Sequence, residues 1–266
     1  MGEVIIKAKN LTKEFTLYKS NRQRLVSELF NLGKGTAFTA LDDVNFKIKK
    51  GEKVAILGRL GSGRSTLIKI LAGVTFPTSG KVSVKGKVTP VFDTKMGFIT
   101  ELPIRENIAL RGVFLGLDKD EIKAREDEIL EFSELAEIAD KPLRMCTRTE
   151  INRLGFAICT SCPKDIIMVD QRFTKKGSGL TGRYKKKLAP LAADEKKTMI
   201  IVSNSGGLLR RFCTRGIVLD KGKLIFDGGI EDAIAIYKTT EPSKSTPRQL
   251  MESIDSEGVD ISSDDL

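Results

Sequence analysis

A cluster of glycines and hydroxyl residues between Gly58 and Thr66 has the composition of a phosphate-binding loop. Its spacing follows the pattern GxxxxGK[ST], except that Arg64 stands at the lysine position. Glycines let the backbone curl so that successive N–H groups point inward, and such a nest binds the oxygens of a pyrophosphate. The sequence therefore predicts a phosphate-binding site made by Gly58, Gly61, Ser62, Gly63, Arg64, Ser65 and Thr66.

The segments that flank this loop favour a phosphate site over a simple glycine turn. Lys53 to Leu57 is a short apolar run typical of a buried strand, and Ser65 to Ala72 has the apolar face of a helix that Gly73 ends. A helix that begins at Ser65 points its positive end at the loop, which favours bound anions. We therefore predict a strand, a phosphate-binding loop and a helix in this order.

The rest of the chain alternates predicted strands and helices. Strands are expected at Val4 to Asn10 and Val44 to Ile48, on either side of a basic, partly helical insertion from Tyr18 to Thr36. Val82, Val84 and Val88 suggest a hairpin. Further strands are expected at Asp165–Asp170, Met199–Ser203, Ile217–Leu219 and Lys223–Phe226, the last two as a hairpin. Helices are expected at Arg105–Asp140, Ile151–Thr160, Gly179–Ala193 and Ile230–Lys238. This alternation predicts an α/β fold with a largely parallel sheet.

The charge of the chain is strongly asymmetric. The formal net charge is +10, but the last sixteen residues, Met251 to Leu266, hold six acids and no base. The preceding residues therefore carry 45 basic against 29 acidic side chains, a net +16. A basic surface is compatible with nucleic acid, anionic lipid or an acidic partner. Nucleic acid is not expected, because the lysine run at Lys185 to Lys187 has the pattern of a solvated helix face without interleaved aromatic residues.

The four cysteines do not form the pattern of a disulfide-rich secreted protein, and no secretory signal is evident, so a reducing cytoplasm is expected. Cys159 and Cys162 make a CxxC, but the chain contains no histidine, and a structural role is expected for this pair. No apolar stretch approaches the ~18–20 residues that a membrane-spanning helix needs. A membrane role is therefore expected only through a partner or a surface.

Beyond the phosphate loop, further motifs resemble those of ATP-binding-cassette (ABC) nucleotide-binding domains. They are Gly97-Phe98, Arg105-Glu106-Asn107, Leu154-Gly155-Phe156-Ala157 and Ile166-Ile167-Met168-Val169-Asp170. Arg22-Gln23-Arg24 and Leu130-Glu131-Phe132-Ser133-Glu134-Leu135 look like the subfamily that exports capsular polysaccharide, O-antigen and teichoic acid.

The resemblance covers roughly Val4 to Lys238 and implies a P-loop NTPase-like ABC domain over residues 1–240. Such a domain has a mixed sheet core, an N-terminal antiparallel β subdomain and a helical subdomain, here at about residues 101–162. Residues 241–266, in which Pro, Ser and acids dominate, are predicted to form an acidic disordered tail.

Several positions depart from the family's catalytic pattern. Arg64 replaces the lysine, Gln171 the catalytic glutamate, and Asn204 the switch histidine. Ile99 stands near the family's loop glutamine, whereas Ser65 and Asp170, which support Mg²⁺ in the family, are retained. A glutamine amide cannot accept the proton of an attacking water. These substitutions predict a pseudo-ATPase that binds nucleotide weakly, if at all, and does not hydrolyse it effectively.

The glycines of the family's signature stretch are also absent. It aligns with Cys146 to Glu150, so Thr147, Arg148, Thr149 and Glu150 stand where small residues approach the ATP of a partner domain. Their bulk and the charge of Glu150 predict a poor lid for a polyphosphate. The aromatic ring that stacks on adenine in the family is expected at Phe15 or Tyr18.

The resemblance implies a cytoplasmic subunit, peripheral on the inner face of the cell membrane, that dimerises with a second copy or another nucleotide-binding domain and docks on membrane permease subunits. ATP and Mg²⁺ are its possible cofactors. Two other functions stay open: an active ATP-hydrolysing exporter subunit, and an ABC-like binding module without a transporter.

Overall fold

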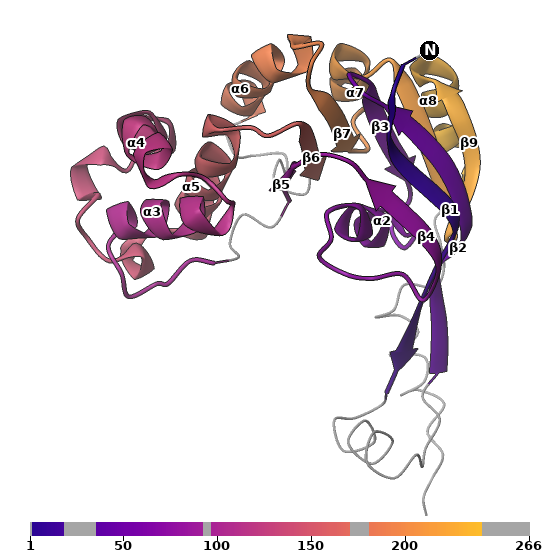
Figure 1. Cartoon of the computed structure of the whole chain (residues 1–266), viewed down its shortest axis with the longest axis horizontal. Helices are drawn as coiled ribbons and strands as arrows, with labels where there is room; N and C mark the ends of the chain where they lie inside the picture. The colour runs from indigo at the N-terminus through magenta and orange to yellow at the C-terminus, as the bar shows by residue number, and fades with distance from the viewer. Residues whose placement is uncertain (1, 19–35, 93–96, 171–180, 241–266) are drawn as a thin grey trace, which may run out of the picture.

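Nearly continuous apolar strands form the centre of the computed structural model, which describes residues 2–18, 36–92, 97–170 and 181–240 (Figure 1). They are β3 (Lys53–Gly58), β6 (Ile166–Asp170), β7 (Thr198–Val202) and β8 (Arg215–Asp220), with β5 (Val88–Val91) and β9 (Lys223–Gly229) at the edges. The order is β5-β6-β7-β3-β8-β9, and only β9 runs antiparallel to its neighbour. The predicted largely parallel sheet and the hairpin of β8 and β9 are confirmed.

A second sheet of three antiparallel strands packs against the first. It consists of β1 (Val4–Leu17), β2 (Thr36–Lys49) and β4 (Ser79–Val84) in the order β2-β1-β4. The predicted end of the first strand near Asn10 is wrong, because β1 continues to Leu17. Asn10 has a φ of 48° and lies at a shift in the register with β2, so its turn-forming character produces a bulge and not a chain reversal. Residues 19–35, most of the predicted insertion, lie outside the described residues.

The predicted hairpin at Val82 to Val88 is also wrong. β4 pairs with β1, with Val84 opposite Ile6, whereas β5 pairs with β6 in the other sheet, with Val88 opposite Ile166. Alternating valines predict strands, but they do not specify the partner of each strand. The chain therefore crosses from one sheet to the other between Val84 and Val88.

Helices cover both sides of the six-stranded sheet. The helix predicted after the phosphate loop is α2 (Arg64–Leu71), which begins and ends one residue earlier than the predicted Ser65 to Ala72. It lies on the side of the sheet that faces the three-stranded sheet. On the other side pack α6 (Thr181–Ala193), α7 (Gly206–Phe212) and α8 (Ile230–Thr239). Helix α7 was not predicted, because Gly206 and Gly207 at its start have low helix propensity.

A three-helix unit forms the other end of the molecule (Figure 1). It contains α3 (Ile104–Phe114), α4 (Lys119–Ser133) and α5 (Arg148–Ser161), with two short 3₁₀ turns, η1 (Ala136–Ile138) and η2 (Leu143–Met145). A cluster of three rings joins this unit to α6: Phe156 lies 5.8 Å from Phe132 and 4.3 Å from Tyr184 between ring centroids. Among the described residues, no helix has the length and apolarity needed to cross a membrane.

Candidate phosphate-binding site

The glycines of the predicted phosphate loop adopt backbone conformations that other residues rarely reach. Gly61 and Gly63 have φ angles of 83° and 96°. A Cβ atom on Gly63 would lie 2.3 Å from the carbonyl oxygen of Ala40, so only glycine fits this position. Gly63 is the N-cap residue of α2 and provides no side-chain cap, which leaves the first N–H groups of α2 to a ligand.

Three predicted site residues lie at the same edge of the six-stranded sheet. Ser65 follows β3 in the first turn of α2, Asp170 ends β6, and Asn204 follows β7. Asp170 is opposite Val202 in the β6–β7 register, so these strands end side by side. In α/β sheets the carboxyl ends of parallel strands form the crevice in which ligands bind. The fold therefore gathers Ser65, Asp170 and Asn204 around the phosphate loop.

A direct hydrogen bond joins Arg64 and Asn204. Nη1 of Arg64 donates to Oδ1 of Asn204 over 2.5 Å. These are the residues predicted to stand in place of the loop lysine and the switch histidine of the ABC pattern. The Arg64 guanidinium thus donates to a neutral amide oxygen at the mouth of the loop. At least one of its N–H groups already has an acceptor within the protein.

The residues that remain fit part of a nucleotide and its metal ion. The glycine nest fits the oxygens of a pyrophosphate, and the Ser65 hydroxyl with the Asp170 carboxylate is a donor set that suits Mg²⁺. Asp170 is only 3% exposed, so its position is set by the packing of β6. The groups that would activate water do not fit, because Asn204 replaces the imidazole and Gln171 the carboxylate. Gln171 itself lies outside the described residues.

Ile99 was predicted to lie near the position of the family's loop glutamine. Its side chain is 44% exposed, while its backbone is held by Asn107, which is fully buried. The Asn107 side chain accepts a hydrogen bond from Ile99 N at 2.8 Å and donates one to Ile99 O at 2.9 Å. Asn107 belongs to the Arg105-Glu106-Asn107 motif, but the sequence did not reveal that its side chain binds the backbone of Ile99.

The predicted signature residues lie at the start of α5, in the three-helix unit. Thr147 is the N-cap residue, and Glu150 folds back to close a capping box. A Glu150 oxygen accepts from Thr147 N at 2.6 Å and from Thr147 Oγ1 at 2.8 Å. The helix begins at Arg148, earlier than the predicted Ile151, because the box provides a complete start signal. A carboxylate therefore occupies the start of α5.

The predicted adenine-stacking residues lie on or next to β1. Phe15 is 40% exposed, and Nζ of Lys13 lies 5.0 Å from the centroid of its ring. The Phe15 ring belongs to β1 of the three-stranded sheet, and its role in stacking on a base stays a prediction. Tyr18, the alternative, is the last described residue before the gap at 19–35.

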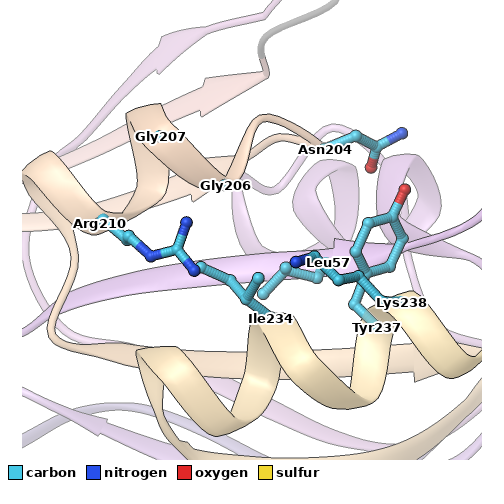
Figure 2. Close-up of a pocket in the computed structure, with 8 residues that line it drawn as sticks. All are labelled: Leu57, Asn204, Gly206, Gly207, Arg210, Ile234, Tyr237 and Lys238. Carbon is cyan, nitrogen blue, oxygen red and sulfur yellow. The ribbon is translucent and has the colours of Figure 1, made fainter.

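Asn204 also lines a pocket that was not predicted from the sequence. It has a volume of about 220 Å³ between α7 and α8, with Leu57 and Ile234 as apolar wall residues. Figure 2 shows the Tyr237 hydroxyl pointing toward Asn204 and Arg210 reaching in from α7. Arg59 of the phosphate loop stacks over the Tyr237 ring at 4.9 Å. The phosphate loop is thereby tied to the end of α8.

Comparison with known proteins gives one consistent family. The ABC transporter family profile matches residues 41–174. The chain is 34% identical to the O-antigen export system ATP-binding protein RfbB of Klebsiella pneumoniae over 89% of this chain and 98% of that protein. It is 33% identical to the RfbB protein of Myxococcus xanthus, over 85% of this chain and 51% of that protein.

Solved structures agree with this assignment. A dimeric ATP-binding cassette in a post-hydrolysis state with bound ADP and phosphate superposes with a TM-score of 0.66 and 25% identity, over 85% of this chain and 98% of that chain. A dimeric bacterial ABC transporter cassette gives a TM-score of 0.65 and 26% identity, with the same coverage. The chain belongs to the ABC transporter family and, within it, to the nucleotide-binding subunits of the polysaccharide-export subfamily.

Proposed function

We propose that this chain is a catalytically degenerate ATP-binding subunit of an ABC system that exports a cell-surface polysaccharide. It holds a nucleotide weakly through its phosphate loop and does not turn it over effectively. The observation that carries this proposal is the hydrogen bond between Arg64 and Asn204. The two side chains that would have to contact the γ-phosphate in an active domain contact each other.

Nucleotide binding rests on the retained residues. The nest from Gly58 to Thr66 binds phosphate oxygens by its N–H groups, and Phe15 offers a ring face to the base. Ser65 and Asp170 would hold a Mg²⁺ ion, which would supply positive charge next to the phosphates. Arg64 keeps a positive charge, but its planar fork is longer than a lysine ammonium and is already engaged.

Catalysis requires groups that the chain does not supply. Removal of one charge-stabilising or proton-accepting group costs about 10²-fold or more in rate, and here the lysine, glutamate and histidine are all replaced. The losses are not additive, but any one of them suffices to reduce turnover strongly. The capping box between Thr147 and Glu150 adds to this loss, since it places a carboxylate where a partner's triphosphate would bind.

The partners are a second nucleotide-binding domain, as a homodimer or heterodimer, and membrane permease subunits. Docking on an apolar partner is supported by one face of α3, where Leu110, Val113 and Phe114 are 41%, 50% and 63% exposed. Residues three and four positions apart lie on the same face of a helix, so these three side chains form one stripe. This arrangement supports a cytoplasmic, peripheral position at the membrane through its partners.

Steady-state ATPase activity of the purified chain tests the proposal. We expect a rate equal to that of the Ser65→Ala and Asp170→Ala variants, within error. A rate clearly above those variants contradicts it and favours an active exporter subunit. A thermal shift with Mg-ATP tests binding separately: saturation at about 100 times Kd stabilises the fold by about 2.7 kcal/mol. If millimolar Mg-ATP does not change the melting temperature of the wild type, nucleotide binding is contradicted, and the chain would act as a scaffold without nucleotide.

A further inference from the structure

One face of the three-stranded sheet carries a dense group of lysines. Strand alternation directs Ile6, Ala8, Phe46 and Ile48 into the core. The exposed side chains that alternate with them along β1 and β2, and those paired with them in β4, point outward. Five of these define the lysine face: Lys7, Lys9, Lys47, Lys49 and Lys81.

The lysine face places like charges directly opposite one another. Lys7 is paired with Lys47 across β1 and β2, and Lys9 with Lys81 across β1 and β4. Side chains in such pairs have Cβ atoms about 4.5–5.5 Å apart, and like charges there are destabilising. None of the five ammonium groups has a carboxylate of the described residues within 4.0 Å. The face therefore carries uncompensated positive charge that an anionic partner would relieve.

The chain contains a matching acidic segment. Residues 251–266 include Glu252, Asp255, Glu257, Asp260, Asp264 and Asp265 and no basic residue. The last described residue before this segment is Thr240, whose carbonyl oxygen accepts a hydrogen bond from Arg59 Nε at 3.1 Å. Because α8 packs on β9 and β9 contacts β2, the chain leaves the described structure at the end of the molecule that bears the three-stranded sheet (Figure 1).

The connecting length is sufficient. The ten residues from 241 to 250 span up to ~35 Å when extended. A folded body of this size has a radius of gyration of roughly 18 Å. The ten-residue connection is therefore about twice as long as this radius, which supports contact between the acidic segment and the lysine face.

We propose that the acidic segment, residues 251–266, binds the lysine face of the same chain through carboxylate–ammonium pairs. Each exposed pair is weak, but a short tether supplies an effective concentration of the order of 1 mM, so a bimolecular Kd of about that value gives half occupancy. Ionic strength screens such pairs, because the Debye length falls from ~30 Å at 0.01 M salt to ~3 Å at 1 M. This inference does not depend on the ATPase activity of the chain.

Zero-length carbodiimide cross-linking of the full chain tests the contact. At low salt we expect Lys–Asp and Lys–Glu cross-links from residues 251–266 to fall mainly on the lysine face and to be lost at high salt. Cross-links spread evenly over exposed lysines, or absent altogether, overturn the proposal. Mixing isotope-labelled and unlabelled chains identifies the source, and cross-links found only between copies overturn binding within one chain.

Heparin affinity of charge variants provides a second, independent test. One variant converts the five face lysines to glutamine; a control makes the same charge change at five exposed lysines elsewhere, Lys119, Lys123, Lys141, Lys186 and Lys196. Replacing the six acids of residues 251–266 with Asn and Gln should raise the salt concentration at which the wild type and the control variant elute from heparin, because the face lysines become free to bind it. In the face variant, which lacks those lysines, we expect the elution salt to rise by less than half as much. An equal increase in all three backgrounds contradicts the proposal, whether or not the chain hydrolyses ATP.

Discussion

Arg64 and Asn204 are 140 residues apart in the sequence, yet the guanidinium of one donates to the amide oxygen of the other at the mouth of the phosphate loop. Arg64 begins α2 and Asn204 follows β7, and the adjacency of β3 and β7 in the parallel sheet brings them together. Two substitutions that look independent in the sequence thus act as one unit. The hydrogen-bonded pair places the positive charge of Arg64 at the mouth of the phosphate loop.

Asn204→Ala should increase nucleotide affinity. The variant removes the acceptor that engages Arg64, so the guanidinium can turn to a phosphate. A net hydrogen bond contributes about 0.5–1.5 kcal/mol, which corresponds to roughly a 2- to 10-fold lower Kd for Mg-ATP. Isothermal titration measures this change, with the exposed neighbour variant Ser205→Ala as the control. A weaker affinity in Asn204→Ala would show that Asn204 itself contacts the nucleotide.

Gly63→Ala should destabilise the fold more than Gly73→Ala. Both residues have positive φ, so each substitution carries a backbone cost of about 1–2 kcal/mol. Only at Gly63 would the new Cβ clash, 2.3 Å from the Ala40 carbonyl oxygen, whereas nothing lies within 4 Å at Gly73. Urea denaturation should show a difference of at least ~1 kcal/mol between the variants. Equal losses would indicate that the phosphate loop shifts without cost.

Thr147→Ala should remove the cap of α5. Loss of an N-cap side chain costs about 0.5–2 kcal/mol in the free energy of unfolding, and here Glu150 also loses the hydrogen bond from Thr147 Oγ1 while it keeps the one from the backbone N–H of residue 147. Thr149→Ala, at an exposed position in the same helical turn, serves as the matched control. The thermal shift produced by nucleotide should be unchanged in both variants when the chain is monomeric. A reduced shift in Thr147→Ala alone would place this helix start near the nucleotide of the same chain.

The ion pairs that Glu128 makes with Lys187 of α6 and Glu134 makes with Arg153 of α5 predict loss of stability in acid. Hydrogen bonds from Lys187 and Arg153 hold the pKa values of Glu128 and Glu134, respectively, below the ordinary 4.5. A depressed carboxyl pKa contributes stability that is present above the unfolded value and is lost as the pH falls through the folded value. The wild type should therefore lose stability relative to Glu128→Gln/Glu134→Gln as the pH falls below about 4.5.

Urea denaturation at several pH values measures this difference. Glu131→Gln, which changes an exposed carboxylate on the same helix, should follow the wild type. If the double variant shows the same pH profile as the wild type, the two ion pairs do not contribute.

The cysteines should differ sharply in reactivity. Burial raises the pKa of Cys213 to about 12, and its side chain is 3% exposed. The thiolate is the reactive form, so Cys213 should resist alkylation by iodoacetamide at pH 8 in the native protein. Half-buried Cys146 and Cys162 should be modified first, as peptide mapping would show. Early modification of Cys213 would indicate local opening between α7 and β8.

Much of the fold could be predicted from local patterns. The buried strands at Ile166–Asp170 and Thr198–Val202 and the hairpin of β8 and β9 follow from apolar runs and turn residues. Strand partners could not be predicted, because the valines of β4 and β5 predict strands but do not specify which sheet each strand joins. The missed α7 and the bulge at Asn10 show tertiary packing overriding local turn signals, as Leu208, Leu209 and Phe212 are buried in the core.

The sequence by itself determined the position and chemistry of the phosphate loop, because glycine spacing constrains the backbone locally, and it determined which catalytic residue types are absent. The tertiary structure alone decided that Arg64 and Asn204 bind each other, that Glu150 closes the start of α5, and that lysines from three strands share one face. The physical reason is that side-chain pairing depends on strand order and register, which arise from contacts between residues far apart in the chain.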